Sequence, residues 1–258
     1  MYKTNLNNIL WYRKLGYYHN PFNIKPAYFT DELVGYESVL NQLMYNIVSG
    51  NMAFLEGPFG SGKTSILQYI KHRFKGEVRI AYISCIQLDE NTNIMKLLAS
   101  GPWYYKLIFG KKPKNITMLV DEAQALSPTN MERIKYLYDN DHIRSVVFAG
   151  ADFNAVSFTF GIKERIGSNI IKSPLLSPDD AVKLIRKRIG NDKLLSDEII
   201  KEMCILSNRN PRRLLQMCED ACIKAIIEGK NSVTKEYTEK IKSKGKQTSL
   251  SRLRLLSS

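Results

Sequence analysis

The chain has 258 residues, of which 44% are hydrophobic and 24% are charged. These values are ordinary for a globular protein and exclude a fibrous, collagen-like or wholly disordered chain. Lys and Arg number 38 against 25 Asp and Glu, so the net charge is +13 at pH 7. This excess favours a polyanionic partner, either nucleic acid or an acidic membrane surface, with a basic but otherwise ordinary protein as the alternative.

The sequence shows no signal for export or for a membrane. No stretch reaches the roughly 18 apolar residues that span a bilayer, and residues 1–20 lack the basic-then-apolar layout of a signal peptide. We therefore expect a cytoplasmic, nucleoid-associated protein without a membrane partner. The cysteines are too few for a disulfide scaffold: Cys85, Cys204, Cys218 and Cys222. We expect Cys218 and Cys222, four residues apart, to be buried thiols rather than metal ligands.

In chain order, the first segment is an aromatic-rich leader over residues 1–30, which we expect to be irregular because Asn20-Pro21 interrupts a helix. Apolar residues three and four apart then predict a helix over Glu37–Ser49, ended by Gly50. The short apolar run Met52–Leu55, followed soon by glycines, indicates a buried strand.

Strand and helix patterns alternate from there to Pro174. Further strands are predicted over residues 78–84, 116–120, 146–149 and 170–172, and helices over residues 63–75, 93–109 and 129–139. Strands separated by helices at this spacing lie parallel with crossover connections. The pattern predicts an α/β fold with a three-layer αβα parallel sheet.

After Pro174 the strand signals stop and three helix starts follow. Ser177, Ser196 and Asn210 can each cap a helix, and prolines follow two of them at the first helical position. A fourth helix can begin at Thr234. We expect four segments: a leader and linker (1–30), an α/β domain (31–174), a small all-helical domain (175–230), and a basic C-terminal helix and tail (231–258).

The sequence GPFGSGKT matches the phosphate-binding motif G-x-x-x-x-G-K-[ST] in full, between a predicted strand and a predicted helix. The loop comprises Gly57, Pro58, Phe59, Gly60, Ser61, Gly62, Lys63 and Thr64. Its glycines let backbone amides turn toward phosphate oxygens at a helix start. Lys63 is expected to reach the β and γ phosphates, and Thr64 to be a Mg²⁺ ligand. The fold is therefore expected to be that of a P-loop NTPase.

A second motif, MLVDEAQ, places two adjacent carboxylates at the end of an apolar strand. Asp121 can hold Mg²⁺ through water, and Glu122, which points the other way, can polarise a water for attack on the γ phosphate. A polar strand end is the alternative. Because a guanine-reading N-K-x-D is absent, ATP is preferred to GTP.

Taken together, GPFGSGKT, VRIAYIS, MLVDEAQ, VVFAG and the helical segment after them resemble the AAA+ ATPases over about residues 20–230. The chain looks most like the group that contains origin-recognition-type initiators, transposition-regulator (TnsC-like) ATPases and ExeA-like ATPases. NPF at residues 20–22 resembles the leader of this group, and NPRRLL at 210–215 its lid motif. LVGYESVLNQL at 33–43 resembles the segment beside the adenine, which implies that Val34 and Gly35 contact the nucleotide.

The resemblance also implies roles for three further residues. Arg212 corresponds to the lid arginine, called sensor 2, that touches the γ phosphate, with Arg213 as the alternative. Arg165 corresponds to the arginine finger that completes the site of a neighbouring subunit, which implies a homo-oligomer; a solvated surface charge is the alternative. Asp152 is our choice for the polar sensor after VVFAG, with Asn154 as the alternative.

The partner is expected to be DNA, contacted through its backbone. Residues 230–258 hold eight Lys and Arg against two Glu, or 8 − 2 = +6 of the net charge, and we expect this tail to be mobile. Lys111, Lys112 and Lys114, which lie near aromatic residues 103–105, are a second candidate patch. Solvation of the tail and core packing of the aromatics are the alternatives.

The expected function is that of an ATP-driven, oligomerising switch on DNA that recruits or regulates a transposase, a helicase or another DNA-processing protein. The 28 residues after Lys230 are too few for the winged-helix domain of a complete initiator, which favours a transposition-regulator or mobile-element type. The alternatives are a replication initiator or helicase loader without a winged helix, and a nucleotide-binding scaffold with weak turnover and protein partners.

Overall fold

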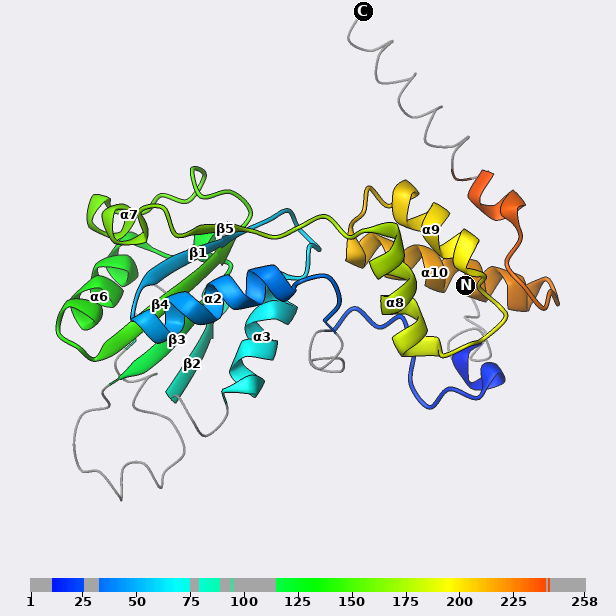
Figure 1. Cartoon of the computed structure of the whole chain (residues 1–258), viewed down its shortest axis with the longest axis horizontal. Coiled ribbons are helices and arrows are strands. Elements are labelled where there is room, and N and C mark those ends of the chain that lie inside the picture. The colour runs from blue at the N-terminus through cyan, green and yellow to red at the C-terminus, as the bar shows by residue number, and fades with distance from the viewer. Residues whose placement is uncertain are drawn as a thin grey trace, which may run out of the picture. The chain divides into compact units, whose positions relative to one another are not determined.

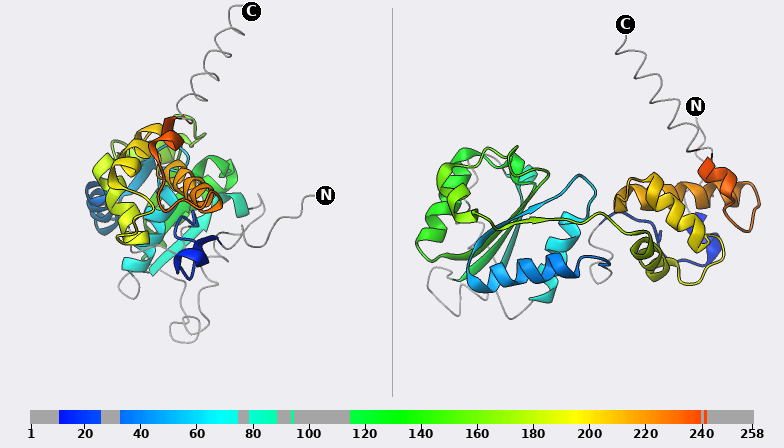
Figure 2. Two further views of the ribbon diagram at one scale, coloured as in Figure 1. Left: turned by 90° about the vertical axis from the view of Figure 1, so that its right-hand side faces the viewer. Right: turned by 45° about the horizontal axis from the view of Figure 1, so that its top comes forward.

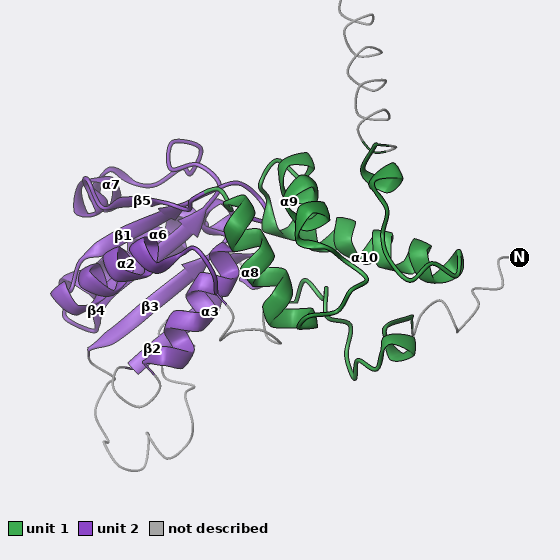
Figure 3. Cartoon of the chain, turned by 45° about the vertical axis from the view of Figure 1, so that its right-hand side comes forward, with its two compact units in different colours: residues 1–28, 175–258 green, residues 29–174 purple. Residues whose placement is uncertain are grey.

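The computed structural model describes residues 11–25, 33–74, 79–88, 94, 115–239 and 241, and it divides the chain into two compact units (Figures 1 and 3). The α/β unit is Phe29–Pro174, purple in Figure 3, and the helical unit, green, combines Met1–Tyr28 with Leu175–Ser258. Most of the predicted helix 93–109, the lysines at 111–114 and the tail after residue 241 lie outside the described residues.

The α/β unit contains a five-stranded parallel sheet in the order β2-β3-β4-β1-β5. Its strands are β1 (Met52–Glu56), β2 (Arg79–Ser84), β3 (Ile116–Asp121), β4 (Ile143–Gly150) and β5 (Ile170–Lys172). Its described helices are α2 (Glu37–Ser49), α3 (Lys63–Arg73), α6 (Pro128–Asp139) and α7 (Phe160–Ile166). The predicted three-layer parallel α/β fold is confirmed.

Both faces of the sheet are covered because its central strands are apolar on both sides. Met118 of β3 belongs to a buried cluster with α6 and α7, while the next residue, Leu119, belongs to a second cluster with α2 and α3 (Figures 1 and 2). Successive strand residues point to opposite faces, so a continuous apolar run serves two cores.

Strand β4 is longer than the apolar run Val146–Ala149 that predicts it. It begins at Ile143 and includes the buried polar residue Ser145, whose hydroxyl lies 2.9 Å from the hydroxyl of Thr117 on β3. A cross-strand hydroxyl pair satisfies both groups inside the sheet. An apolar pattern cannot reveal such an extension because it depends on a partner in another strand.

The helical unit contains α8 (Pro178–Ile189), α9 (Asp197–Leu206) and α10 (Pro211–Ile227). All three caps identified in the sequence accept a backbone N–H: Ser177 that of Asp180, Ser196 that of Ile199, and Asn210 that of Arg213. Residues 235–239 are also helical. Among the described helices, none combines the length and apolar character that crossing a bilayer requires.

The described part of the leader, residues 11–25, packs within the helical unit. Trp11, in a short 3-10 helix (Trp11–Leu15), stacks on Phe22 with ring centroids 5.9 Å apart, and both side chains are buried. The Tyr17 hydroxyl donates to Asp192 Oδ2 at 2.7 Å, just past the end of α8. Arg188 of α8 donates to two leader carbonyls. Residues 11–25 thus contact α8 and, just past its end, Asp192.

Candidate functional site

The phosphate-binding loop, Gly57–Thr64, connects β1 to α3 at the carboxyl end of the sheet. A side chain at Gly57 would place Cβ 2.7 Å from Ser61 Oγ and 2.8 Å from Ser173 Cβ, so only glycine fits there. Gly62 has φ +87°, and its Cβ would lie 2.7 Å from Tyr36 Oη. Both glycines are therefore required by close packing, and Gly62 also by its left-handed backbone.

The loop has the features of an anion site. No side chain caps the start of α3, so its first amides keep their donors for a ligand. Lys63 Nζ folds back onto the loop and donates to Gly57 O at 2.6 Å and to Pro58 O at 3.1 Å. The buried hydroxyl of Ser61 has no hydrogen-bond partner within the described residues. Uncapped amides, a lysine and a buried free hydroxyl in a glycine cradle fit a nucleotide phosphate.

Tyr36 ties this loop to the segment that precedes α2. It follows Val34, which is buried, and Gly35, whose φ is +80°. The Tyr36 hydroxyl donates to the carbonyl of Ser61 at 2.7 Å, and burial raises its pKa, so it remains a donor. No sequence pattern indicates this bond because its acceptor is a backbone carbonyl 25 residues away.

The two expected magnesium ligands lie together. Thr64 Oγ1 donates to Asp121 Oδ2 at 2.7 Å, across 57 residues of sequence, and Asp121 is 3% exposed. The other oxygen, Oδ1, accepts the N–H of Glu122 at 3.0 Å. A hydroxyl and a carboxylate beside a phosphate loop are oxygen donors of the kind that Mg²⁺ prefers. The residues present therefore fit this ion.

Glu122 adopts a left-handed backbone conformation, with φ 58° and ψ 47°. This conformation is uncommon outside glycine and is often found at functional sites. One of its carboxylate oxygens, Oε2, accepts a hydrogen bond from Gln124 Nε2 at 2.8 Å. Sequence reasoning missed Gln124, although it belongs to the same motif. The bond leaves Oε1 as the oxygen that can accept a proton from water.

The loop after β4 carries both sensor candidates, and both are exposed. Asp152 Oδ1 accepts the N–H of Asn154 at 2.9 Å and so holds its own turn together. The N–H of Phe153 between them donates to Glu56 Oε1, also at 2.9 Å. Glu56 is the last residue of β1, immediately before the phosphate loop. The structure thus adds Glu56 as the residue that holds the loop with the two sensor candidates beside the phosphate loop.

The side chain of Arg165, the finger candidate, is hydrogen-bonded to residues of the same chain. It lies on α7, and Nε and Nη2 each donate to the Asp139 carboxylate at 2.9 Å, while Nη1 donates to Gly161 O at 2.7 Å. Arg212 and Arg213 are exposed in the first turn of α10, in the helical unit.

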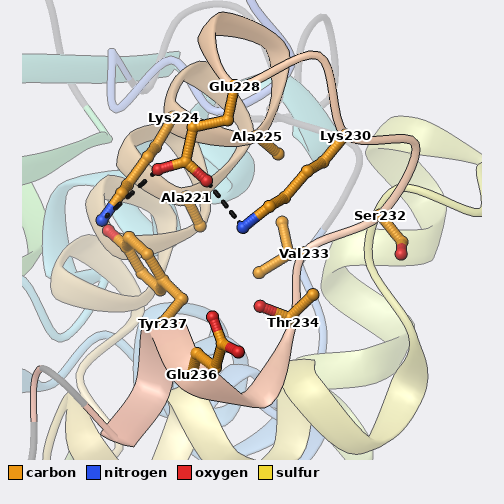
Figure 4. A pocket seen from close by; sticks show the side chains of 10 residues that line it. All are labelled: Ala221, Lys224, Ala225, Glu228, Lys230, Ser232, Val233, Thr234, Glu236 and Tyr237. Atoms are coloured by element: carbon orange, nitrogen blue, oxygen red, sulfur yellow. Dashed lines mark ion pairs between the residues drawn. The ribbon is translucent and has the colours of Figure 1, made fainter.

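A pocket opens in the helical unit between α10 and the residues that follow it (Figure 4). Two lysines and two glutamates face it, so it has no excess positive charge to attract a phosphate backbone. Glu228 pairs with Lys230 at 2.8 Å and with Lys224 at 3.9 Å, and Lys224 lies over the ring of Tyr237. No residue of the two nucleotide motifs lines it.

A parallel sheet with a glycine-rich loop after one strand and an acidic pair after another defines a P-loop nucleotide-binding unit, here joined to a helical unit. No protein-family model matches the chain, and no curated protein sequence matches it. Solved structures do match. Cdc6p from Pyrobaculum aerophilum has a TM-score of 0.69 and 16% identity over 86% of this chain and 70% of its own.

Two further structures are similar. Aeropyrum pernix Orc1, solved in complex with DNA, has a TM-score of 0.64 and 16% identity over 88% of this chain and 69% of its own. The Thermotoga maritima RuvB Holliday junction branch migration motor has a TM-score of 0.58 and 14% identity over 81% of this chain and 68% of its own. Identities this low show the fold alone, and that fold is the P-loop AAA+ fold.

Proposed function

We propose that this chain is an AAA+ ATPase that binds ATP with Mg²⁺, assembles into oligomers on DNA, and recruits or regulates other DNA-processing machinery. The observation that carries the proposal is the bond between Thr64 and Asp121 beneath the uncapped start of α3. It unites the two motifs into one site, with Glu122 next to it.

Each residue of the site has a defined task. The loop amides and Lys63 bind the phosphates, Val34 and Gly35 flank the adenine, and Thr64 with Asp121 holds the metal ion. When bound, Mg²⁺ neutralises charge on the phosphates. Glu122 orients a water and accepts its proton through Oε1, because Gln124 occupies Oε2.

The proposal for ATP is tested by binding and turnover measurements. We expect Lys63→Ala to weaken ATP binding, and Glu122→Gln to retain binding while losing turnover by about 10²-fold or more, the scale of a lost general base. The matched control is Glu132→Gln, an exposed acid on α6 of the same unit. Unchanged turnover in Glu122→Gln would refute the assignment of the base.

A role on DNA is supported by the charge of the chain and by two neighbours, one solved with DNA and one described as a Holliday junction motor. We favour a transposition-regulator or mobile-element type, with a transposase or helicase as partner. A replication initiator or helicase loader is the alternative.

We expect duplex DNA to stimulate ATP turnover, and binding to fall steeply with salt because backbone contacts release counterions. Fluorescence anisotropy with a labelled duplex measures this. Replacing Lys242, Lys244 and Lys246 by alanine should reduce the salt dependence, whereas replacing Lys111, Lys112 and Lys114 tests the second patch. Absence of DNA retention at low salt would exclude the DNA role.

We propose Arg165 as the arginine finger, which requires it to leave Asp139 when subunits assemble. Mixing Arg165→Ala with Glu122→Gln subunits should restore some turnover, because each supplies what the other lacks. Asp139→Asn frees the guanidinium and should preserve or raise turnover at a given protein concentration. Assembled mixed oligomers without rescue would count against a finger.

Arg212 is proposed as the lid arginine that touches the γ phosphate, and Arg213 is its neighbour control, equally exposed in the same helical turn. Arg212→Ala should weaken ATP binding relative to ADP. An effect confined to Arg213→Ala would shift the assignment by one position.

A second candidate is a nucleotide-binding scaffold with weak turnover. The bond from Gln124 to the Glu122 carboxylate favours it, because one of the two carboxylate oxygens is then bonded to a side chain instead of to a water. Gln124→Ala separates the two functions. A rise in turnover indicates that Gln124 restrains Glu122, as in a scaffold, and a fall indicates that Gln124 positions Glu122 for ATP hydrolysis.

A further inference from the structure

Tyr82 lies on β2 with its side chain packed against the α3 side of the sheet, where it is half-buried. Its hydroxyl donates to Asp121 Oδ2 at 2.9 Å, the same oxygen that accepts the hydroxyl of Thr64 at 2.7 Å. Neither motif contains Tyr82, which is 39 residues from Asp121 in the sequence. It is therefore a third side chain at the proposed metal site.

Within the part of the chain that the structure describes, the hydrogen-bond donors to Asp121 are neutral: two hydroxyls on Oδ2 and one backbone N–H on Oδ1. Neutral donors stabilise a buried carboxylate without cancelling its charge. The negative charge of Asp121 thus stays available to a metal ion. A cation in place of Tyr82 would compete with that ion.

The two hydroxyls on Oδ2 differ in what else they must do. Thr64 is expected to turn a lone pair to the metal, so its oxygen is shared. The Tyr82 oxygen lies at the end of a rigid ring, with Lys71 Nζ 5.7 Å from the ring centroid. The position of the Tyr82 hydroxyl beside Asp121 thus does not depend on a bound metal ion.

We propose that Tyr82 is a positioning residue for Mg²⁺: its hydroxyl fixes the orientation of the Asp121 carboxylate and thereby strengthens metal-dependent nucleotide binding. The proposal rests on the proposed ATP site. Removing a residue that hydrogen-bonds a metal ligand typically changes metal affinity by about 10- to 100-fold. Asp121 is expected to hold the ion through water, so we expect a value near the lower end, about 10-fold.

The test compares the affinity for a fluorescent ATP analogue in excess Mg²⁺ with that in EDTA. All variants carry Glu122→Gln, so turnover does not interfere, and the ratio of the two affinities measures the gain from the metal. Tyr82→Phe keeps the ring and removes only the hydroxyl. The control is Tyr138→Phe, which removes a phenolic hydroxyl bonded to Gly50 O at 2.7 Å in the same unit.

We expect Tyr82→Phe to lower the Mg²⁺-dependent gain about 10-fold and to leave the affinity in EDTA unchanged, whereas Tyr138→Phe changes neither. An unchanged gain in Tyr82→Phe overturns the proposal. A loss of affinity in EDTA equal to that in Mg²⁺ also overturns it, because this would be general damage to the nucleotide site. If the parent protein binds no nucleotide with Mg²⁺, the proposed function itself fails, and the role of Tyr82 with it.

Discussion

Gly62 is the position where a single added methyl group tests the packing of the phosphate loop. Its φ of +87° is left-handed, which costs an alanine about 1–2 kcal/mol. In addition, the new Cβ would lie 2.7 Å from Tyr36 Oη, closer than real Cβ atoms approach. The tyrosine must shift and give up its bond to the Ser61 carbonyl.

The second cost follows from the burial of that bond. Tyr36 is 6% exposed, so breaking the contact leaves a buried hydroxyl and carbonyl without partners, worth about 1–3 kcal/mol. We therefore expect Gly62→Ala to lower the free energy of unfolding of the α/β unit by about 2–5 kcal/mol in total.

A double-mutant cycle isolates the steric part. In Tyr36→Phe the hydroxyl is gone, and the nearest atom to the new Cβ becomes the ring carbon Cζ at 3.2 Å. Gly62→Ala should then cost only the backbone contribution, so the two mutations should be coupled by about 1–3 kcal/mol. Gly50→Ala is the backbone control in the same unit, because its φ is +77° and the nearest atom to the added Cβ lies at an ordinary contact distance of 3.4 Å.

Hydrogen exchange of the β1 and α3 amides, read by mass spectrometry, reports the stability of the α/β unit by itself. The same variants are assayed for ATP binding, which should fall in parallel with loop distortion. If Gly62→Ala lowers the free energy of unfolding equally in the parent protein and in Tyr36→Phe, the reasoning is refuted, because the added methyl group then does not displace the Tyr36 hydroxyl.

Two predictions concern other parts of the chain. Ser177→Ala removes the cap of α8, and we expect the helical unit to lose about 1 kcal/mol of stability in urea denaturation. Exposed Ser232→Ala is the control; equal losses would contradict the cap. Cys85 is buried, and burial together with Asp121 and Glu122 raises its pKa to about 12. Its thiol should therefore resist iodoacetamide at pH 8.5 until the protein unfolds, and rapid labelling of the native protein would contradict this. The thiol of the unfolded chain ionises at a lower pH than the buried thiol of the folded protein. The contribution of protonated Cys85 to the free energy of unfolding is therefore present below about pH 8.5 and is lost as the pH rises toward 12.

Local patterns in the sequence were sufficient for most of the fold. The helix Glu37–Ser49 and the strand Ile170–Lys172 have the predicted bounds, because apolar spacing depends on residues three or four apart and on alternating faces. The caps of the helical unit are equally local, since Ser177 bonds an amide three residues on. The phosphate loop is contiguous, so its motif can be recognised without a partner elsewhere.

The tertiary structure alone decided the contacts between residues that no short sequence pattern links. Tyr36 bonds to the phosphate loop, Tyr82 bonds to Asp121, and Glu56 bonds to the loop after β4, each through a bond whose geometry exists only after the sheet has formed. The pairing of Arg165 with Asp139 likewise joins two helices. The sequence by itself thus determined the parallel α/β pattern and the two nucleotide motifs, because these depend on near neighbours along the chain, whereas the strand order and helix α7 (Phe160–Ile166) came only from the structure. The supports that hold the motifs in place depend on distances in space, which packing of the folded chain alone sets.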